Sequence, residues 1–287
     1  MILTVIVPLV LIIGVGFFIG KIKKIDINPF VDFLLYVTVP ALMITSLVEN
    51  STKLSNIAVM FTSGIFVMLG LWILVVLFFK LFNCRSDGLK LSMAFGNTGN
   101  LGLPVALFAF GSVGLAQALV YDMSTAFLIY TVGIYAVSKK DSLKEVFRMP
   151  QIYAIIISVL LVYFAIPIPD FIFTPLDLIG KITIPLALII LGYKLTEVKV
   201  TSIKFGLLSS AVRIGGGLLL ASIFVFLFNI QGITRSVILM QSAMPSALMS
   251  MILAQKYHSD PEKAASAVFI STIISLVTIP ILLYFIM

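Results

Sequence analysis

Two long apolar stretches of the chain are each interrupted by a run of polar and small residues that contains a proline. The runs are Gly96-Asn97-Thr98-Gly99-Asn100-Leu101-Gly102-Leu103-Pro104 and Gln241-Ser242-Ala243-Met244-Pro245-Ser246. Inside a bilayer, a helix broken in this way must line a cavity or be covered by protein, because water does not reach the freed backbone groups. Such breaks mark the binding sites of many membrane transporters. The candidate binding residues are therefore Asn97, Thr98, Gly99, Asn100, Pro104, Gln241, Ser242, Pro245 and Ser246.

The ends of the half-helices offer two kinds of chemistry. Half-helices that begin near Pro104 and Pro245 would present unpaired N–H groups and partial positive charge, which suit a carboxylate. Half-helices that end near Asn97 and Gln241 would present carbonyl oxygens, which could hold water or a cation, including a sodium ion near Asn100 and Gln241. A second interpretation is that the polar side chains only satisfy backbone groups that the break sets free.

Two charged residues lie inside apolar segments, where charges are costly and commonly functional. We predict that Asp122 carries a coupling proton or forms part of a sodium site. Arg213 would then be its counter-ion or would attract a substrate carboxylate. The alternatives are a static ion pair between packed helices, or an arginine that extends to the membrane surface.

The composition is that of a polytopic membrane protein. Of the 287 residues, 61% are hydrophobic and 11% are charged, against about 25% charged in soluble domains. The net charge of +7 is spread between apolar segments, so we expect a lipid bilayer and no nucleic acid as a partner. The single cysteine, Cys84, and the single histidine, His258, have no partner at metal-ligand spacing, so neither a metal nor another cofactor is expected.

Hydrophobic windows and turn signals predict an all-α integral membrane protein with about ten transmembrane helices. The expected spans are residues 1–20, 30–48, 54–79, 88–110, 114–137, 150–169, 171–193, 203–229, 233–255 and 263–286. With the amino terminus outside, most of the 19 lysines and arginines fall in inner loops, whereas Lys53 and Arg235 fall in outer ones. Because basic residues favour cytoplasmic loops, we predict a multi-pass protein of the plasma (cell) membrane with both termini outside.

The two halves of the chain share a pattern of residues. Aspartate, threonine and proline recur with the same spacing at Asp32, Thr38 and Pro40 and at Asp177, Thr183 and Pro185. Residues 1–137 would form a first five-helix repeat, 138–149 a short cytoplasmic linker, and 150–287 a second repeat. Because five is an odd number, the second repeat would be inverted in the membrane, which is an architecture of secondary transporters.

The run that ends at Pro104 resembles the signature of the auxin efflux carrier family. That family includes the plant PIN and PIN-like carriers and prokaryotic permeases, and the likeness extends over the whole chain. It implies a fold similar to bile-acid/sodium symporters and sodium/proton antiporters, with broken helices 4 and 9 crossing at the centre. It also implies a scaffold of helices 1, 2, 6 and 7, a moving bundle of helices 3–5 and 8–10, an elevator-type motion, and a homodimer through the scaffold. The central loop is short, so neither regulation by loop phosphorylation nor specificity for auxin is carried over from the plant carriers.

We therefore expect a secondary active transporter of a small organic anion, such as a mono- or dicarboxylate, with proton or sodium coupling left open. The main alternative is a proton- or sodium-coupled transporter or antiporter of an inorganic ion. An intramembrane enzyme is disfavoured because the sequence has no His/Glu zinc motif, no Gly-x-Ser-x-Gly motif and no intramembrane aspartate pair on adjacent turns. A channel is disfavoured because a pore rarely needs an inverted pair of broken helices.

Overall fold

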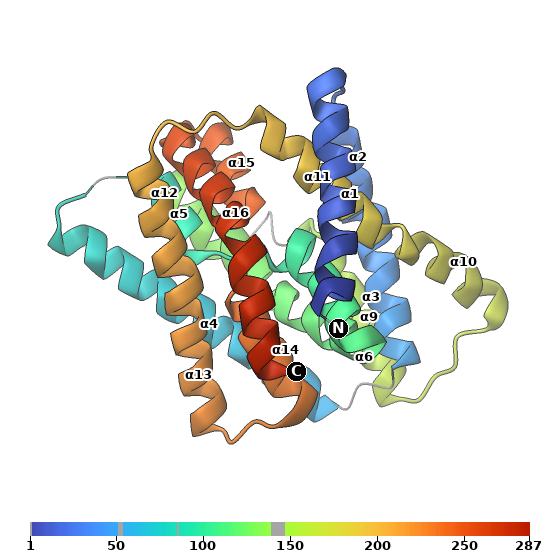
Figure 1. The fold of residues 1–287 in the computed structure, drawn as a ribbon. Helices are drawn as coiled ribbons and strands as arrows, with labels where there is room; N and C mark the ends of the chain where they lie inside the picture. The colour runs from blue at the N-terminus through green and yellow to red at the C-terminus, as the bar shows by residue number, and fades with distance from the viewer. Residues whose placement is uncertain (1, 51–53, 85, 139–146) are drawn as a thin grey trace.

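The computed structural model describes residues 2–50, 54–84, 86–138 and 147–287 (Figure 1). Within these ranges the secondary structure is helical, and no strand forms beyond an isolated antiparallel pairing of Gly96 with Ser246. Most of the predicted linker 138–149 lies outside the described residues, as do Lys53 and Arg85. The described part of the chain thus has the all-α architecture that the sequence predicts.

The helical segments follow one another with short connections, and several contain a π-helical turn, labelled η. In the first half they are α1 (Ile2–Ile22), α2 (Asn28–Phe33), η1 (Leu34–Thr38), α3 (Val39–Glu49), α4 (Leu54–Leu81), α5 (Asp87–Ala94), η2 (Thr98–Gly102), α6 (Leu103–Leu128), η3 (Ile129–Gly133) and α7 (Ile134–Ser138). In the second half they are α9 (Pro150–Tyr163), α10 (Asp170–Lys181), α11 (Thr183–Glu197), α12 (Ile203–Ser210), η4 (Ala211–Gly216), α13 (Gly217–Leu227), α14 (Gly232–Ser242), α15 (Leu248–Lys256) and α16 (Pro261–Ile286).

Seven helical segments of the described chain are long and apolar enough to cross a membrane. They are Ile2–Ile22, Asn28–Glu49, Asn56–Leu81, Thr98–Ser138, Asp170–Glu197, Ile203–Leu227 and Pro261–Ile286. The number is below the expected ten for three reasons, one of which is that α9, in the expected span 150–169, has only 14 residues. The interrupted helices consist of short halves, and Thr98–Ser138 counts as one segment although the chain leaves helical geometry at Gly111, where φ is 68°. A left-handed φ of this kind suits glycine, and it lies at the expected junction between two spans. The count of ten spans stays a prediction.

Two sets of helices pack among themselves. In one set, α1 runs along α11, and α3 packs against α9 and α10. In the other, α4 packs against α5, α6 and α13, while α16 packs against α5, α12 and α15. Glycines allow the backbones of α1 and α11 to touch, because a Cβ at Gly16 would lie 2.1 Å from the Ile189 carbonyl oxygen and one at Gly192 would lie 2.0 Å from that of Ile13.

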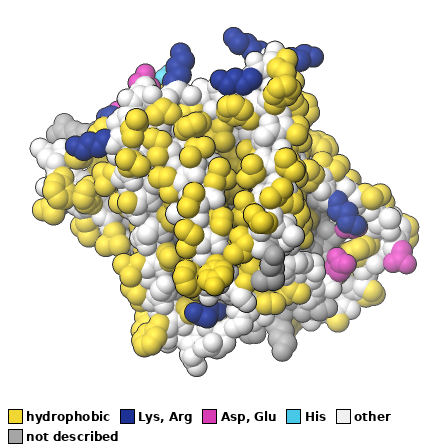
Figure 2. Space-filling view, in the orientation of Figure 1, with side chains coloured by type: hydrophobic (Ala, Val, Ile, Leu, Met, Phe, Trp, Pro, Cys, Tyr) yellow, Lys and Arg dark blue, Asp and Glu magenta, His cyan; other side chains and the backbone are white. Residues whose placement is uncertain are grey.

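The outer surface of the molecule is apolar along the helices and charged at one end. Hydrophobic side chains cover the face in Figure 2, and the side chains of Phe226 and Phe171 are 85% and 78% exposed. Most lysines and arginines on this face gather at the end of the molecule opposite the two termini, which lie together in Figure 1. Large exposed apolar surfaces belong in lipid rather than in water, so this is the surface of a multi-pass integral membrane protein.

Candidate binding site

The two interruptions meet, and their backbones pair with each other. The Asn97 N–H donates to the Pro245 carbonyl at 2.7 Å, and the Ala247 N–H donates to the Phe95 carbonyl at 2.9 Å. These bonds flank the pairing of Gly96 with Ser246. Two segments that are far apart in sequence therefore satisfy one another's freed backbone groups, which is the condition for irregular backbone inside a membrane protein.

The helices after the two breaks begin close to the two prolines but not at them. The first break ends at Thr98, where the turn η2 begins, and Pro104 lies further on as the second residue of α6. The second break includes Pro245, and α15 begins only at Leu248. Pro104 therefore lies in the first turn of α6, as expected, although the helical turn η2 precedes it, and α15 begins three residues after Pro245. Proline tolerates the first turns of a helix, but the extended pairing of the two breaks determines where each helix starts.

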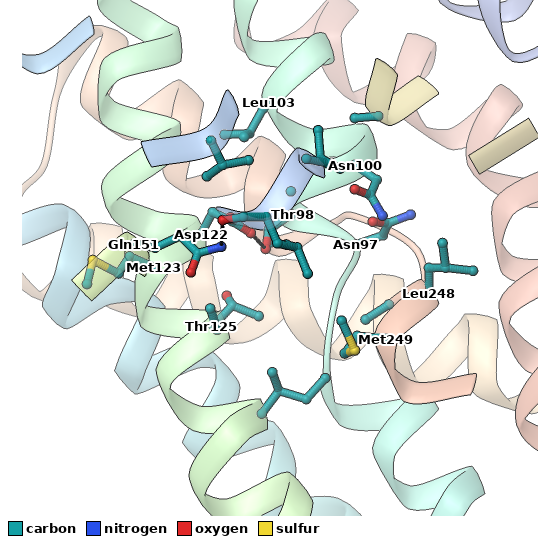
Figure 3. A pocket seen from close by; sticks show the side chains of 18 of the residues that line it. Asn97, Thr98, Asn100, Leu103, Asp122, Met123, Thr125, Gln151, Leu248 and Met249 are labelled. Carbon is teal, nitrogen blue, oxygen red and sulfur yellow. Dashed lines mark hydrogen bonds between the residues drawn. The ribbon is translucent and has the colours of Figure 1, made fainter. Parts of the chain in front are cut away.

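A cavity of about 130 Å³ lies at this crossing (Figure 3). On one side it is lined by the amino-terminal ends of η2 and α15 and by α6 and η3. On the other side it is lined by α2, η1 and α3 and by α9 and α11. One buried water needs about 10–15 Å³ of such space, so the cavity is large enough for a small organic molecule.

The cavity collects only some of the predicted site residues. Asn97, Thr98, Gly99, Asn100 and Asp122 line it. The other candidates are not among its lining residues; they are Pro104, Arg213, Gln241, Ser242, Pro245 and Ser246.

Asp122 faces the first of the two amino-terminal helix ends. Its Oδ1 accepts a hydrogen bond from the Thr98 hydroxyl at 2.5 Å, as the dashed line in Figure 3 marks. A Cβ at Gly99 would lie 3.2 Å from the same Oδ1, so the carboxyl group also packs against the backbone of η2. A carboxylate is stabilised at this end of a helix by the partial positive charge of the N–H groups. The protein thus places a carboxyl group of its own at one of the two helix ends.

Arg213 lies behind the cavity and is fully buried. Its Nη2 donates to the Ser242 carbonyl at 2.8 Å, and its Nη1 and Nε donate to the carbonyls of Ala94 and Met244, each at 3.2 Å. No ion pair joins it to Asp122, although the structure describes both residues. The expected pairing of the two charges is therefore wrong, and so is the alternative of an arginine that extends to the surface. The guanidinium instead lies directly against three backbone carbonyls.

Most polar groups of the second break have neighbouring partners, but the buried Gln241 Oε1 has none. Gln241 Nε2 lies 3.4 Å from the carbonyls of Thr98 and Ala118, and the Ser242 hydroxyl bonds to that of Tyr121 at 2.7 Å. The Ser246 N–H donates to the Ser271 hydroxyl at 3.0 Å. The interpretation in which side chains satisfy freed backbone groups fits Gln241 Nε2, whereas the Ser242 hydroxyl bonds to a side chain and the Ser246 contact is made by its backbone. Asn100 lines the cavity and Gln241 does not, and a sodium site near these two residues stays a prediction.

Four cavity-lining side chains carry buried polar atoms that have no hydrogen-bond partner. They are Asn97 Nδ2, Thr125 Oγ1, Gln151 Oε1 and Thr183 Oγ1. A buried polar atom without a partner costs about 1–3 kcal/mol, so these groups are suited to a bound ligand or water. One donor, one acceptor and two hydroxyls thus point to a ligand that has both polar and apolar parts.

Thr125 and Gln151 were missed by the sequence reasoning, and Thr183 was noted only for its place in the repeat. Thr125 follows Asp122 by three residues and so shares its helix face, which is a signal that the sequence does contain. Gln151 has a second task, because its Nε2 donates to the Leu35 carbonyl at 2.9 Å. In a π-helical turn such as η1, the N–H of residue i+5 donates to the carbonyl of residue i. For the Leu35 carbonyl that residue is Pro40, which has no N–H, so the carbonyl is left for Gln151.

These features together define a class of protein. It is a multi-pass membrane protein in which two interrupted helices cross beside a cavity, as in secondary transporters. Among the described residues, no three His, Cys, Asp or Glu side chains are grouped as metal ligands would be.

The chain belongs to the family described as membrane transport protein, whose model matches residues 1–142 and 134–283. This is the auxin efflux carrier family that the run before Pro104 resembles. An uncharacterized transporter of Methanocaldococcus jannaschii is 31% identical over 305 residues, covering 96% of this chain and 95% of that protein. An uncharacterized transporter of Methanothermobacter thermautotrophicus is 29% identical over 203 residues, covering 69% of this chain and 67% of that protein. The family consists of transporters, not enzymes.

Proposed function

We propose that this protein is a secondary active transporter that moves a small organic anion with a single carboxylate group across the cell membrane. The observation that carries the proposal is the cavity at the crossing, where two amino-terminal helix ends meet unpartnered polar atoms and an apolar wall. An anion is stabilised at such helix ends without any basic side chain.

The substrate carboxylate would bind at the amino terminus of α15. Its N-cap residue, Ala247, offers no side-chain hydrogen bond, so the N–H groups of the first turn have no acidic cap. The other helix end, at η2, already faces Asp122. One helix end thus faces a carboxyl group of the protein and the other does not, which supports one site for one substrate carboxylate.

The rest of the cavity favours a monocarboxylate over a dicarboxylate. Asp122 is the only charged side chain among the described residues that line it, and most of the wall is apolar, with Leu34, Met43, Met123 and Ile190. A second carboxylate would enter an apolar space without a cation, and an unpaired buried charge is strongly unfavourable. The unpartnered amide and hydroxyls would bind polar groups of the substrate.

Movement would follow an elevator-type alternating-access mechanism within ten spans arranged as two inverted repeats. The cavity lies between two sets of helices, which supports a scaffold that holds α1, α3, α9 and α11 and a moving bundle that carries the crossing. The gathering of lysines and arginines opposite the termini supports an orientation with both termini outside. We assign homodimer contacts to the outer face of the scaffold.

Asp122 would couple substrate movement to protons. Protonation would remove its negative charge from the end of η2 and so favour entry of the substrate anion into the same cavity. A sodium-coupled or inorganic-ion transporter is the alternative that the assay below distinguishes.

Uptake by purified protein in liposomes tests this function. Labelled monocarboxylates, dicarboxylates and indole acids are offered under separate proton and sodium gradients. We expect uptake of a monocarboxylate driven by the proton gradient. Asn97→Ala should weaken it because the variant removes an unpartnered donor, whereas Asn56→Ala on α4, away from the cavity, should not. If none of the three acid classes is transported, the proposed function is wrong.

A further inference from the structure

We propose that the Arg213 side chain is a resident cation of the crossing, which takes the position that a dissolved sodium ion would otherwise occupy. Transport would then require no sodium. The inference rests on the proposed transport function and extends it to the identity of the coupling ion.

The contacts of Arg213 come from both breaks. Its three donor nitrogens bond to the carbonyls of Ala94, Ser242 and Met244 at 2.8–3.2 Å. Ala94 is the last residue of α5 and Ser242 the last of α14, so the carboxyl-terminal ends of both half-helices point to one guanidinium. Each such end carries partial negative charge, and carbonyls at these ends and in unwound segments are the groups that coordinate sodium in transporters with broken helices.

The guanidinium fits its surroundings closely. Arg213 is 0% exposed, and a Cβ at Gly96 would lie 2.6 Å from Nη2. A Cβ at Gly217 would lie 3.2 Å from Nη1. Glycine at both positions therefore leaves room for the guanidinium. No carboxylate pairs with Arg213 among the described side chains, so the carbonyls are what compensates its charge.

A resident cation has a consequence for the transport cycle. A dissolved sodium ion binds and leaves in each cycle, whereas the arginine stays with the helices that carry it. The ion gradient that drives transport would then act through Asp122, on the cavity side of the crossing, and not through the carbonyl ends behind it.

Cation dependence of the apparent Tm tests the inference without reference to any substrate. The purified full-length protein is compared in sodium, potassium and choline chloride at equal ionic strength. We expect no difference for the wild type, because the site already holds a cation. Arg213→Ala should lower the Tm, and millimolar guanidinium should restore part of the loss. The matched control, Arg235→Ala, removes an exposed arginine of α14. It should change neither the Tm nor the response of the Tm to guanidinium.

A purely structural role for Arg213 predicts a Tm loss that no cation restores, and that result would overturn the proposal. A wild-type Tm or uptake rate that rises specifically with sodium would also overturn it. If the alanine variant does not fold, Arg213→Lys keeps the charge and should retain sodium-independent behaviour. Guanidinium could restore the Tm of Arg213→Ala while none of the acids is taken up. That result would support the resident cation and refute the organic-anion function. The failure of one proposal is therefore distinguishable from the failure of the other.

Discussion

Replacing Gly217 with alanine would place a methyl carbon 2.1 Å from the carbonyl oxygen of Ser242, the same oxygen that accepts a hydrogen bond from Arg213. Ordinary contact begins at about 3.4 Å, so the backbone of α13 or of the second break must move by more than an ångström. Packed interiors resist such shifts, and overpacking costs about 1–3 kcal/mol. At about 2–4 °C for each kcal/mol, the apparent Tm should fall by roughly 2–12 °C.

The neighbouring Gly215 provides a matched control, because a Cβ there would meet nothing within 4 Å. Gly215→Ala should leave the Tm unchanged or raise it slightly, since alanine favours a helix over glycine. Thermal unfolding of the two variants in detergent, followed by uptake in liposomes, measures both effects. Gly217→Ala should also lower uptake, because the shift disturbs the Arg213 contacts. If the two variants have equal Tm values, the close approach of Gly217 to the Ser242 carbonyl oxygen is wrong.

Two further predictions concern the cavity. Asp122→Asn removes the titratable group but keeps an oxygen that can accept the Thr98 hydrogen bond, so proton-driven uptake should be lost while exchange of labelled for unlabelled acid continues. An unchanged dependence of uptake on the pH gradient would contradict the coupling role. Thr125→Val removes an unpartnered hydroxyl at nearly constant volume and should raise the KM by about 2- to 12-fold, the equivalent of one hydrogen bond of about 0.5–1.5 kcal/mol. Thr62→Val on the exposed face of α4 is the control, and an equal KM for the two variants would exclude Thr125 from the site.

The membrane fold and the interrupted helices were predictable from the sequence because their signals are local. Hydropathy identifies the spans, and glycine, asparagine and proline in apolar runs identify the breaks. The run from Gly96 to Asn100 interrupts the helix and also forms the start of the next helical turn, η2. The residues that the sequence marks as a break are therefore residues that line the cavity. Asp122 was predictable because a carboxyl group in an apolar span is costly and is therefore commonly functional.

The partners of the side chains were not predictable, because they are backbone atoms of remote segments. Arg213 was expected to pair with a side chain of opposite charge, but it binds carbonyls that no residue type reveals. Helix starts at Thr98 and Leu248 depend on the pairing of the two breaks, which is a tertiary contact. Gln151 and Thr183 look like ordinary polar residues near helix ends, and only the packing of α9 and α11 against the crossing brings them to the cavity.

The central claim is that the transported anion binds in the cavity beside the amino terminus of α15. Substrate protection of a single cysteine tests it most directly, because Cys84 is exposed and Cys84→Ser gives a cysteine-free background. Met249→Cys lies in the cavity wall, and Lys204→Cys at the exposed start of α12 is the control. The account predicts that the transported acid slows labelling of Met249→Cys by a thiol reagent and leaves Lys204→Cys unaffected. A labelling rate at Met249→Cys that saturating acid does not change would contradict it.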